Sequence, residues 1–257
     1  MSGLEGRSVV ITRSRAQAEP FAQALSARGA IPILFPTIEI RPLNDCSALD
    51  DALTHLDQYD WIVFTSANTV SAVWNRLRAL GRTNLAGARR IAAVGPATGA
   101  ELVERGAAID AVPTTFRGAA IADALGRLDD QRVLLPRADI GREETAEALR
   151  DAGAVVDEVV AYQTVMPVSD RFGLTALRAG VDAITFTSPS TVHNFVSLVG
   201  PDSPKLLARS VVACIGPVTA AAVTDLGLAH PLQAHHSTSE GLIEILEAHF
   251  ARRAGRS

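Results

Sequence analysis

The chain has 257 residues with a formal net charge of −4, 47% hydrophobic residues and 20% charged residues, a composition typical of a folded globular protein. Its length suits one large domain or two of about 120 residues, and its acidic balance argues against binding to nucleic acid or to a membrane surface. Cys46 and Cys214 are too far apart in the sequence to indicate a disulfide framework. Because no apolar stretch precedes the first predicted strand and no run of about 18 apolar residues occurs, we expect a cytoplasmic protein without signal peptide or membrane span.

Short apolar runs alternate with amphipathic, helix-like stretches along the whole chain. This alternation is typical of βαβ units and therefore of a parallel sheet. The strand-like runs lie at residues 9–11, 33–35, 61–64, 91–94, 133–135, 183–186 and 211–215. The sequence therefore predicts the α/β fold class.

An internal repeat is the most informative feature of the sequence. Residues 61–70 (WIVFTSANTV) match residues 183–192 (AITFTSPSTV), and residues 92–98 (AAVGPAT) match residues 213–219 (ACIGPVT). The openings correspond as well, because residues 9–13 (VVITR) resemble residues 133–137 (VLLPR). All three matches have an offset of 121 to 124 residues, which indicates two homologous halves.

The division of these halves into domains is predicted from two extended stretches, residues 37–41 and 159–166, which are bracketed by prolines. We interpret these stretches as paired crossovers. The prediction is a discontinuous first domain of residues 1–37 and 168–257, a second domain of residues 42–160, and a hinge connector of residues 38–41 and 161–167. A sequential split near residue 130 is the alternative that the sequence leaves open.

Four strand-to-helix turns share one design, in which a strand ends and a small or hydroxyl-bearing residue begins the next helix. In an open parallel sheet such turns lie at the carboxyl edge, where ligands bind, and free N–H groups at helix N-termini attract anions. A serine there can equally be only a helix cap, but four similar turns in two repeated halves favour a ligand site. The candidate substrate-binding residues of these turns are Thr65, Ser66, Gly95, Thr98, Ser188, Ser190, Gly216 and Thr219.

Arginines follow the first strand of each half. Arg13 and Arg137 occupy equivalent positions in the repeat, and Arg15 and Arg142 come a few residues later. A guanidinium group at such a place can bind a carboxylate or phosphate through its bidentate fork, although a single arginine can also be a solvated surface group. The repeated placement makes Arg13 and Arg137 candidate substrate contacts, ahead of the other two.

Cofactor motifs are missing from the sequence. His235 and His236 are adjacent but lack HExxH, CxxC or carboxylate ligands at metal-binding spacing. No stretch reads GxGxxG, no Gly-Lys-Ser/Thr ends a loop, and no GxSxG elbow occurs. We therefore expect neither a metal nor another cofactor.

Tyr162 falls in the predicted connector and is the candidate catalytic residue. Its phenol can act as a proton donor toward a bound ligand. The alternative is an interfacial aromatic side chain whose hydroxyl bonds only water or backbone.

The ordered series of motifs resembles uroporphyrinogen-III synthases. The motifs are FTS at 64–66, VGPAT at 94–98, YQT at 162–164, FTSPS at 186–190, IGPVT at 215–219 and STSEGL at 237–242. The similarity extends from residue 9 to about residue 246. It implies two flavodoxin-like parallel-sheet domains joined by a two-stranded connector.

The resemblance also implies the reaction, which is cyclisation of hydroxymethylbilane to uroporphyrinogen III with loss of water and inversion of ring D. It implies no cofactor, a catalytic Tyr162, and Arg13 as a basic contact for a substrate with eight carboxylates. One departure is visible, because the turn before Thr219 lacks a lysine that some members carry and Arg209 is the only basic residue nearby. We expect a monomer whose partners are this small-molecule substrate and, transiently, the preceding pathway enzyme, with no nucleic acid and no membrane.

Two other classes of function compete with the enzyme. A two-domain binding protein could close on a ligand around a hinge without chemistry, and a non-catalytic relative could bind or sense a tetrapyrrole. Turnover of hydroxymethylbilane, as opposed to binding alone, distinguishes both from a synthase.

Overall fold

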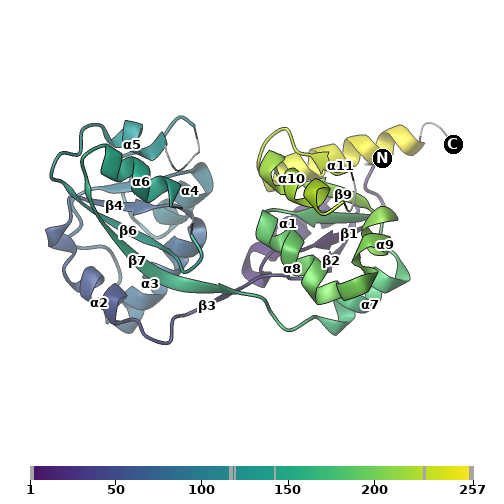
Figure 1. Ribbon diagram of the computed structural model, residues 1–257, viewed down its shortest axis with the longest axis horizontal. Coiled ribbons are helices and arrows are strands. Elements are labelled where there is room, and N and C mark those ends of the chain that lie inside the picture. Colours follow the sequence, from purple (N-terminus) through teal and green to yellow (C-terminus); the bar gives the residue numbers. More distant parts are fainter. Residues whose placement is uncertain (1–2, 116–117, 119, 142, 228–229, 255–257) are drawn as a thin grey trace. The chain divides into compact units, whose positions relative to one another are not determined.

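The computed structural model describes residues 3–115, 118, 120–141, 143–227 and 230–254. The chain divides into two compact units, the first made of Met1–Glu39 with Val165–Ser257 and the second of Ile40–Thr164. The predicted boundaries were residues 37 and 168 for the first domain and residues 42 and 160 for the second. Each unit has a mainly parallel sheet between two layers of helices (Figure 1), so the predicted fold class is confirmed. In the described ranges, no helix has the length and apolarity needed to cross a membrane.

The sheet of the first unit has the strand order β10-β9-β8-β1-β2, and the neighbouring strands are parallel. Renumbered along the chain, this is the 2-1-3-4-5 order of flavodoxin-like sheets. Val9, Val10 and Ile11 are fully buried, as expected for a strand covered by helices on both faces. The strands are β1 (Ser8–Ile11), β2 (Ile31–Leu34), β8 (Ala183–Phe186), β9 (Val211–Cys214) and β10 (Leu232–Gln233).

Helices cover both faces of this sheet. On one face, Phe21 and Leu25 of α1 (Arg15–Ser26) pack with Leu242 and Leu246 of α11 (Ser239–Ala254). Each such buried side chain contributes about 1.5–3 kcal/mol to stability. The other face is covered by α7 (Arg171–Ala179), α8 (Pro189–Val199), α9 (Ser203–Ala208) and α10 (Pro217–Asp225), and the short η2 (Gly200–Asp202) joins α8 to α9.

The sheet of the second unit has the order β3-β7-β6-β4-β5. Its strands are β3 (Glu39–Arg41), β4 (Trp61–Phe64), β5 (Ile91–Ala93), β6 (Arg132–Ala138) and β7 (Val155–Val165). One face is covered by α2 (Ser47–Thr54), η1 (Leu56–Gln58), α3 (Ala67–Ala79) and α4 (Pro96–Glu104), and the other by α5 (Ala120–Leu125) and α6 (Glu144–Asp151). Part of the predicted connector, residues 161–165, is the end of β7, and β3 is the strand beside it.

The two halves of the repeat do not coincide with the two units. By the offsets of the repeat, β6 is the equivalent of β1, β4 of β8 and β5 of β9, and an isolated bridge of Ala111 to Ala92 takes the place of β10. The first unit takes β1 and β2 from the first half and β8 to β10 from the second. Figure 1 shows this mixture as purple strands among green and yellow elements. Each unit therefore contains strands of both halves, in the same spatial order.

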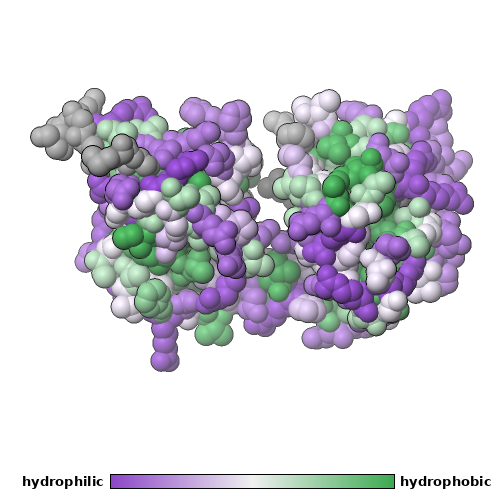
Figure 2. Space-filling view, turned by 180° about the vertical axis from the view of Figure 1, so that it is seen from behind, coloured by the Kyte–Doolittle hydropathy of each residue, from purple (hydrophilic) through white to green (hydrophobic). Residues whose placement is uncertain are grey.

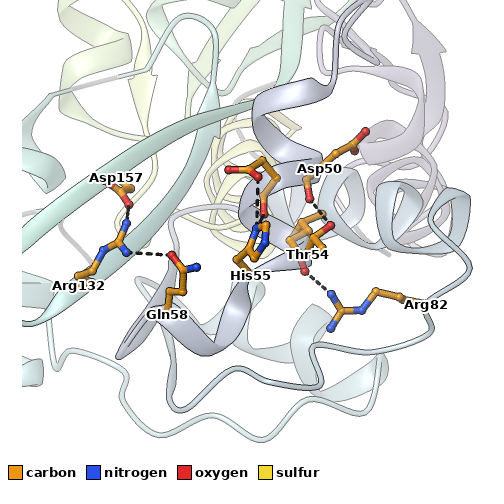
Figure 3. Close-up of polar contacts among 9 residues, drawn as sticks. Asp50, Thr54, His55, Gln58, Arg82, Arg132 and Asp157 are labelled. Carbon is orange, nitrogen blue, oxygen red and sulfur yellow. Dashed lines mark hydrogen bonds and ion pairs between the residues drawn. The ribbon is translucent and has the colours of Figure 1, made fainter.

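Charged groups at the amino edge of the second sheet are paired with one another. Figure 3 shows Arg132 of β6 donating to Asp157 at 2.7 Å and to Gln58 at 3.1 Å. The same guanidinium lies 5.1 Å from the ring centroid of Tyr59, where burial and the Asp157 carboxylate raise the pKa of the phenol to about 12. Mutual pairing of this kind indicates a structural network.

The outer surface mixes polar and apolar side chains. Figure 2 shows one face of each unit, where hydrophilic side chains predominate and apolar side chains gather in smaller groups. The most exposed large hydrophobic side chains include Val168, Phe172 and Ile140. Single exposed apolar side chains are normal for a folded protein. Ile140, however, lies just beyond the carboxyl end of β6, near the candidate functional site described next.

Candidate functional site

Several of the candidate residues lie at the carboxyl ends of the central strands of each sheet. In the first sheet the chain leads from β1 to β2 on one side and from β8 to β9 on the other. In the second sheet it leads from β6 to β7 on one side and from β4 to β5 on the other. Open α/β sheets bind ligands at this topological switch point, beyond the carboxyl ends of the strands. Arg13 and Ser188 lie there in the first unit, and Thr65, Ser66 and Arg137 in the second.

The predicted helix starts are confirmed in all four turns. Ser66 is the N-cap of α3, and its Oγ accepts a hydrogen bond from the Thr69 N–H at 3.2 Å. Ser188 is the N-cap of α8, and its Oγ accepts from the Thr191 N–H at 3.3 Å. The Ser188 hydroxyl also hydrogen-bonds that of Ser190 at 2.8 Å. Both serines therefore cap helices. A ligand would have to hydrogen-bond to the backbone amides that these caps do not use, or to the remaining hydrogen-bonding positions of the hydroxyls.

The other two turns are capped by glycine. Gly95 precedes α4 and Gly216 precedes α10, both in extended conformation, and neither helix has a side-chain cap. A proline follows each glycine at the first helical position, so the free amides begin at the second. Thr98 and Thr219 stand at the third position, and each is buried. These uncapped helix starts are suited to an anionic ligand.

The two equivalent arginines have different environments. Arg137 Nε lies 3.2 Å from Glu158 Oε2, so this guanidinium is paired within the second unit with a carboxylate that Arg150 also contacts at 2.7 Å. Arg13 donates from Nη1 to Ser239 Oγ at 2.9 Å, and its Nε is buried without a partner. Burial lowers the pKa of Arg13. The structure thus separates two residues that the sequence presents as alike.

The remaining basic candidates are used elsewhere or are not described. Arg15 pairs with Asp170 at 2.6 Å, and Arg142 lies outside the described residues. Arg209 precedes β9 and donates to the carbonyls of Leu177 and Arg178. It therefore lies at the amino end of β9, whereas the turn before Thr219 lies at the carboxyl end.

Tyr162 lies on β7, opposite Ala138 of β6 in the strand register. It is 6% exposed and belongs to the buried cluster that contains Phe64 and Trp74. Its ring is therefore part of the core of the second unit, close to the end of β6. Its role in catalysis stays a prediction.

Three residues of these edges were not predicted as site residues. Ser239 is the first residue of α11 and contacts Arg13; the motif STSEGL contained it without indicating its contact. Ile140 and Val218 are exposed apolar side chains beside the turns, which hydropathy alone cannot distinguish from core residues. In the part of the chain that the structure describes, no group of three or more His, Cys, Asp or Glu is placed to hold a metal ion.

Known proteins resemble this chain over nearly its whole length. A family model described as "Uroporphyrinogen-III synthase HemD" matches residues 19–244. The uroporphyrinogen-III synthase of Synechococcus elongatus is 33% identical over 252 residues, covering 95% of this chain and 96% of the relative. That of Chlorobaculum parvum is 30% identical, covering 86% of this chain and 90% of the relative.

Solved structures share the fold. The uroporphyrinogen-III synthetase of Helicobacter pylori matches with a TM-score of 0.64 at 17% identity, covering 95% of this chain and 99% of the other. A mutant uroporphyrinogen III synthase of Thermus thermophilus matches with a TM-score of 0.62 at 22% identity, covering 98% and 100%. The family model and the sequence relatives together show that this chain belongs to the uroporphyrinogen-III synthase family.

Proposed function

We propose that the chain cyclises hydroxymethylbilane to uroporphyrinogen III. The observation that carries the proposal is the repeated set of helix starts at the carboxyl edges of both sheets, in a chain of this family. The linear tetrapyrrole has eight carboxylates, and uncapped helix N-termini are suited to binding such groups. Non-catalytic binding of a tetrapyrrole is the second candidate function.

The substrate contacts that we propose lie at the carboxyl edge of each sheet. The amides and hydroxyls of the four turns would bind carboxylates, with Arg13 adding a charge-assisted hydrogen bond. Ile140 and Val218, both exposed beside the turns, would contact the apolar faces of the pyrrole rings. The proposed turn residues are Thr65, Ser66, Gly95, Thr98, Ser188, Ser190, Gly216 and Thr219. Arg137 would join them only by exchanging its bond to Glu158 for one to the substrate.

The reaction needs orientation more than activation. The hydroxyl of the hydroxymethyl group on ring A leaves as water, and the methylene carbon of the resulting azafulvene is attacked by the substituted carbon of ring D to form a spiro intermediate. Fragmentation and reclosure then invert ring D, so that one water is the only group lost. Since the substrate also cyclises unaided without inversion, the enzyme acts chiefly by holding the chain in one geometry. Tyr162 would assist departure of the hydroxyl as a proton donor.

An isomer assay tests the proposal. The purified protein is given hydroxymethylbilane without added metal, flavin or nucleotide, and the oxidised product is separated into type III and type I uroporphyrin. Predominance of type III is the expected result. Type I alone under saturating enzyme would reject the proposal, and tight binding without turnover would favour the sensing protein.

The setting of the reaction is part of the same proposal. We expect the chain to act as a monomer in the cytoplasm and to receive its reactive substrate through transient contact with the preceding enzyme. Cys46 and Cys214 are both free thiols, which suits a reducing compartment. Sedimentation of the purified protein tests whether it is a monomer, and sedimentation with the preceding enzyme tests the transient contact.

A further inference from the structure

Among the described residues no carboxylate pairs with Arg13, unlike the arginine at the other end of the same strand. Arg7 precedes β1 and lies 2.8 Å from Asp182. Arg13 follows β1, and among the described residues its partner is the neutral hydroxyl of Ser239. A partly buried guanidinium without an anion is costly, so its persistence in the fold indicates a function.

The repeat shows where the counter-charge would be. In the second unit, Glu158 pairs with Arg137 from the neighbouring strand, where Leu135 and Glu158 are in register. In the first unit the corresponding strands place Ile11 in register with Leu34. Leu34 therefore occupies the position of Glu158, and the carboxylate that neutralises Arg137 has no equivalent beside Arg13.

The groups around Arg13 are donors that lack an acceptor. Arg13 Nε is buried without a partner, and so is the Oγ of Ser14, which is 3% exposed. Ser239 Oγ accepts from Arg13, which leaves its own proton free to donate. Glu240, the next residue of α11, is bound to Arg28 at 2.6 Å and does not fill this role. An anionic acceptor would bind the Arg13 guanidinium and the Ser239 hydroxyl, the two groups that contact each other.

We propose that Arg13 and Ser239 form a subsite that binds one carboxylate side chain of the linear tetrapyrrole. The start of the C-terminal helix α11 is then part of the substrate-binding surface, where the helix dipole also favours an anion. This inference rests on the proposed function and extends it to Ser239, which acts both as a donor to the carboxylate and as the support that orients the guanidinium.

Steady-state kinetics with hydroxymethylbilane test the subsite. Arg13→Gln removes a charge-assisted bond to the bound substrate and should raise KM roughly 10- to 100-fold with little change in kcat. Ser239→Ala should raise KM about 3- to 10-fold, and Ser239→Thr, which keeps the hydroxyl, should restore it. Arg7→Gln is the matched control, because it removes the arginine at the opposite end of β1 and should lower the melting temperature while KM stays at the wild-type value.

A further variant supplies the missing carboxylate. Leu34→Glu should neutralise Arg13 as Glu158 neutralises Arg137, and should raise KM although Arg13 is unchanged. Its melting temperature is measured on the same sample, and Leu34→Gln controls for the loss of an apolar side chain. An increase in KM as large for Gln as for Glu would contradict neutralisation.

Binding of uroporphyrin III, an octacarboxylate, separates failure of the subsite from failure of the proposed function. Fluorescence titration should give a weaker affinity for Arg13→Gln and Ser239→Ala than for wild type and Arg7→Gln. If wild type forms no type III product, the function fails, and this titration still tests the subsite. Wild-type affinity and KM in both Arg13→Gln and Ser239→Ala would overturn the proposal, and an effect of Arg13→Gln alone would remove Ser239 from it.

Discussion

Tyr162→Phe separates a catalytic from a structural role for this buried tyrosine. Because the side chain is 6% exposed within the cluster of Phe64 and Trp74, Tyr162→Ala would lose about 3–5 kcal/mol of stability and would confuse the two roles. Phenylalanine retains the ring and its packing and removes only the hydroxyl. If the phenol donates a proton to the departing hydroxyl of ring A, turnover should fall roughly 100-fold or more, the usual lower bound for general-acid assistance.

The assay is initial-rate formation of uroporphyrinogen III at saturating hydroxymethylbilane, with thermal unfolding of the same preparation. An unchanged melting temperature with the predicted loss of kcat supports the catalytic role of Tyr162. Wild-type turnover in the Phe variant would refute the reasoning and leave Tyr162 as a core residue. The fraction of type III product gives a further measure, because a variant that orients the substrate normally should slow the reaction without changing the isomer.

Two other predictions concern groups outside the site. Burial opposes ionisation of Asp182, but hydrogen bonds from Ser8 and the Arg7 guanidinium outweigh it and hold the pKa of the carboxyl below its ordinary value. Asp182→Asn should therefore destabilise the protein by about 1–2 kcal/mol at pH 7. Because a carboxyl with a lowered pKa stabilises the fold only while it is ionised, the difference in unfolding free energy between wild type and variant should shrink below about pH 4. Urea titrations at several pH values measure this difference, and a value that does not change with pH would contradict the prediction. Cys214 is fully buried, and burial raises the pKa of its thiol to about 12, so a thiol reagent should modify partly exposed Cys46 in the native protein and both cysteines only after unfolding.

The fold class and the four turns could be predicted because their causes are local in the sequence. Strands covered on both faces need unbroken apolar runs, and such runs stand out at residues 61–64 and 183–186. Extended glycine or serine followed by proline marks a helix start, as at Gly216 and Ser188. The internal repeat then identified the equivalent turns without any knowledge of their contacts.

The environments of the candidate residues could not be predicted, since they depend on contacts distant in the sequence. Arg13 and Arg137 have equivalent sequence positions, but one contacts Ser239, 226 residues away, and the other contacts Glu158 on a neighbouring strand. Tyr162 was placed in a connector by the prolines around it, whereas its strand continues within the sheet of the second unit. Hydropathy and spacing contain no information about which of two similar side chains meets a carboxylate.

The exchange of strands between the halves of the repeat gives the two units the same arrangement of strands around β1 and β6. Because β1 and β6 each lie beside a strand from the other half, both units place an arginine and a hydroxyl-capped helix at the same switch point. The repeat therefore gives each unit a similar edge, at which an arginine lies near a hydroxyl-capped helix start. One position in the neighbouring strand differs between the two edges: Glu158 pairs with Arg137 in the second unit, and Leu34 stands at the equivalent position beside Arg13 in the first.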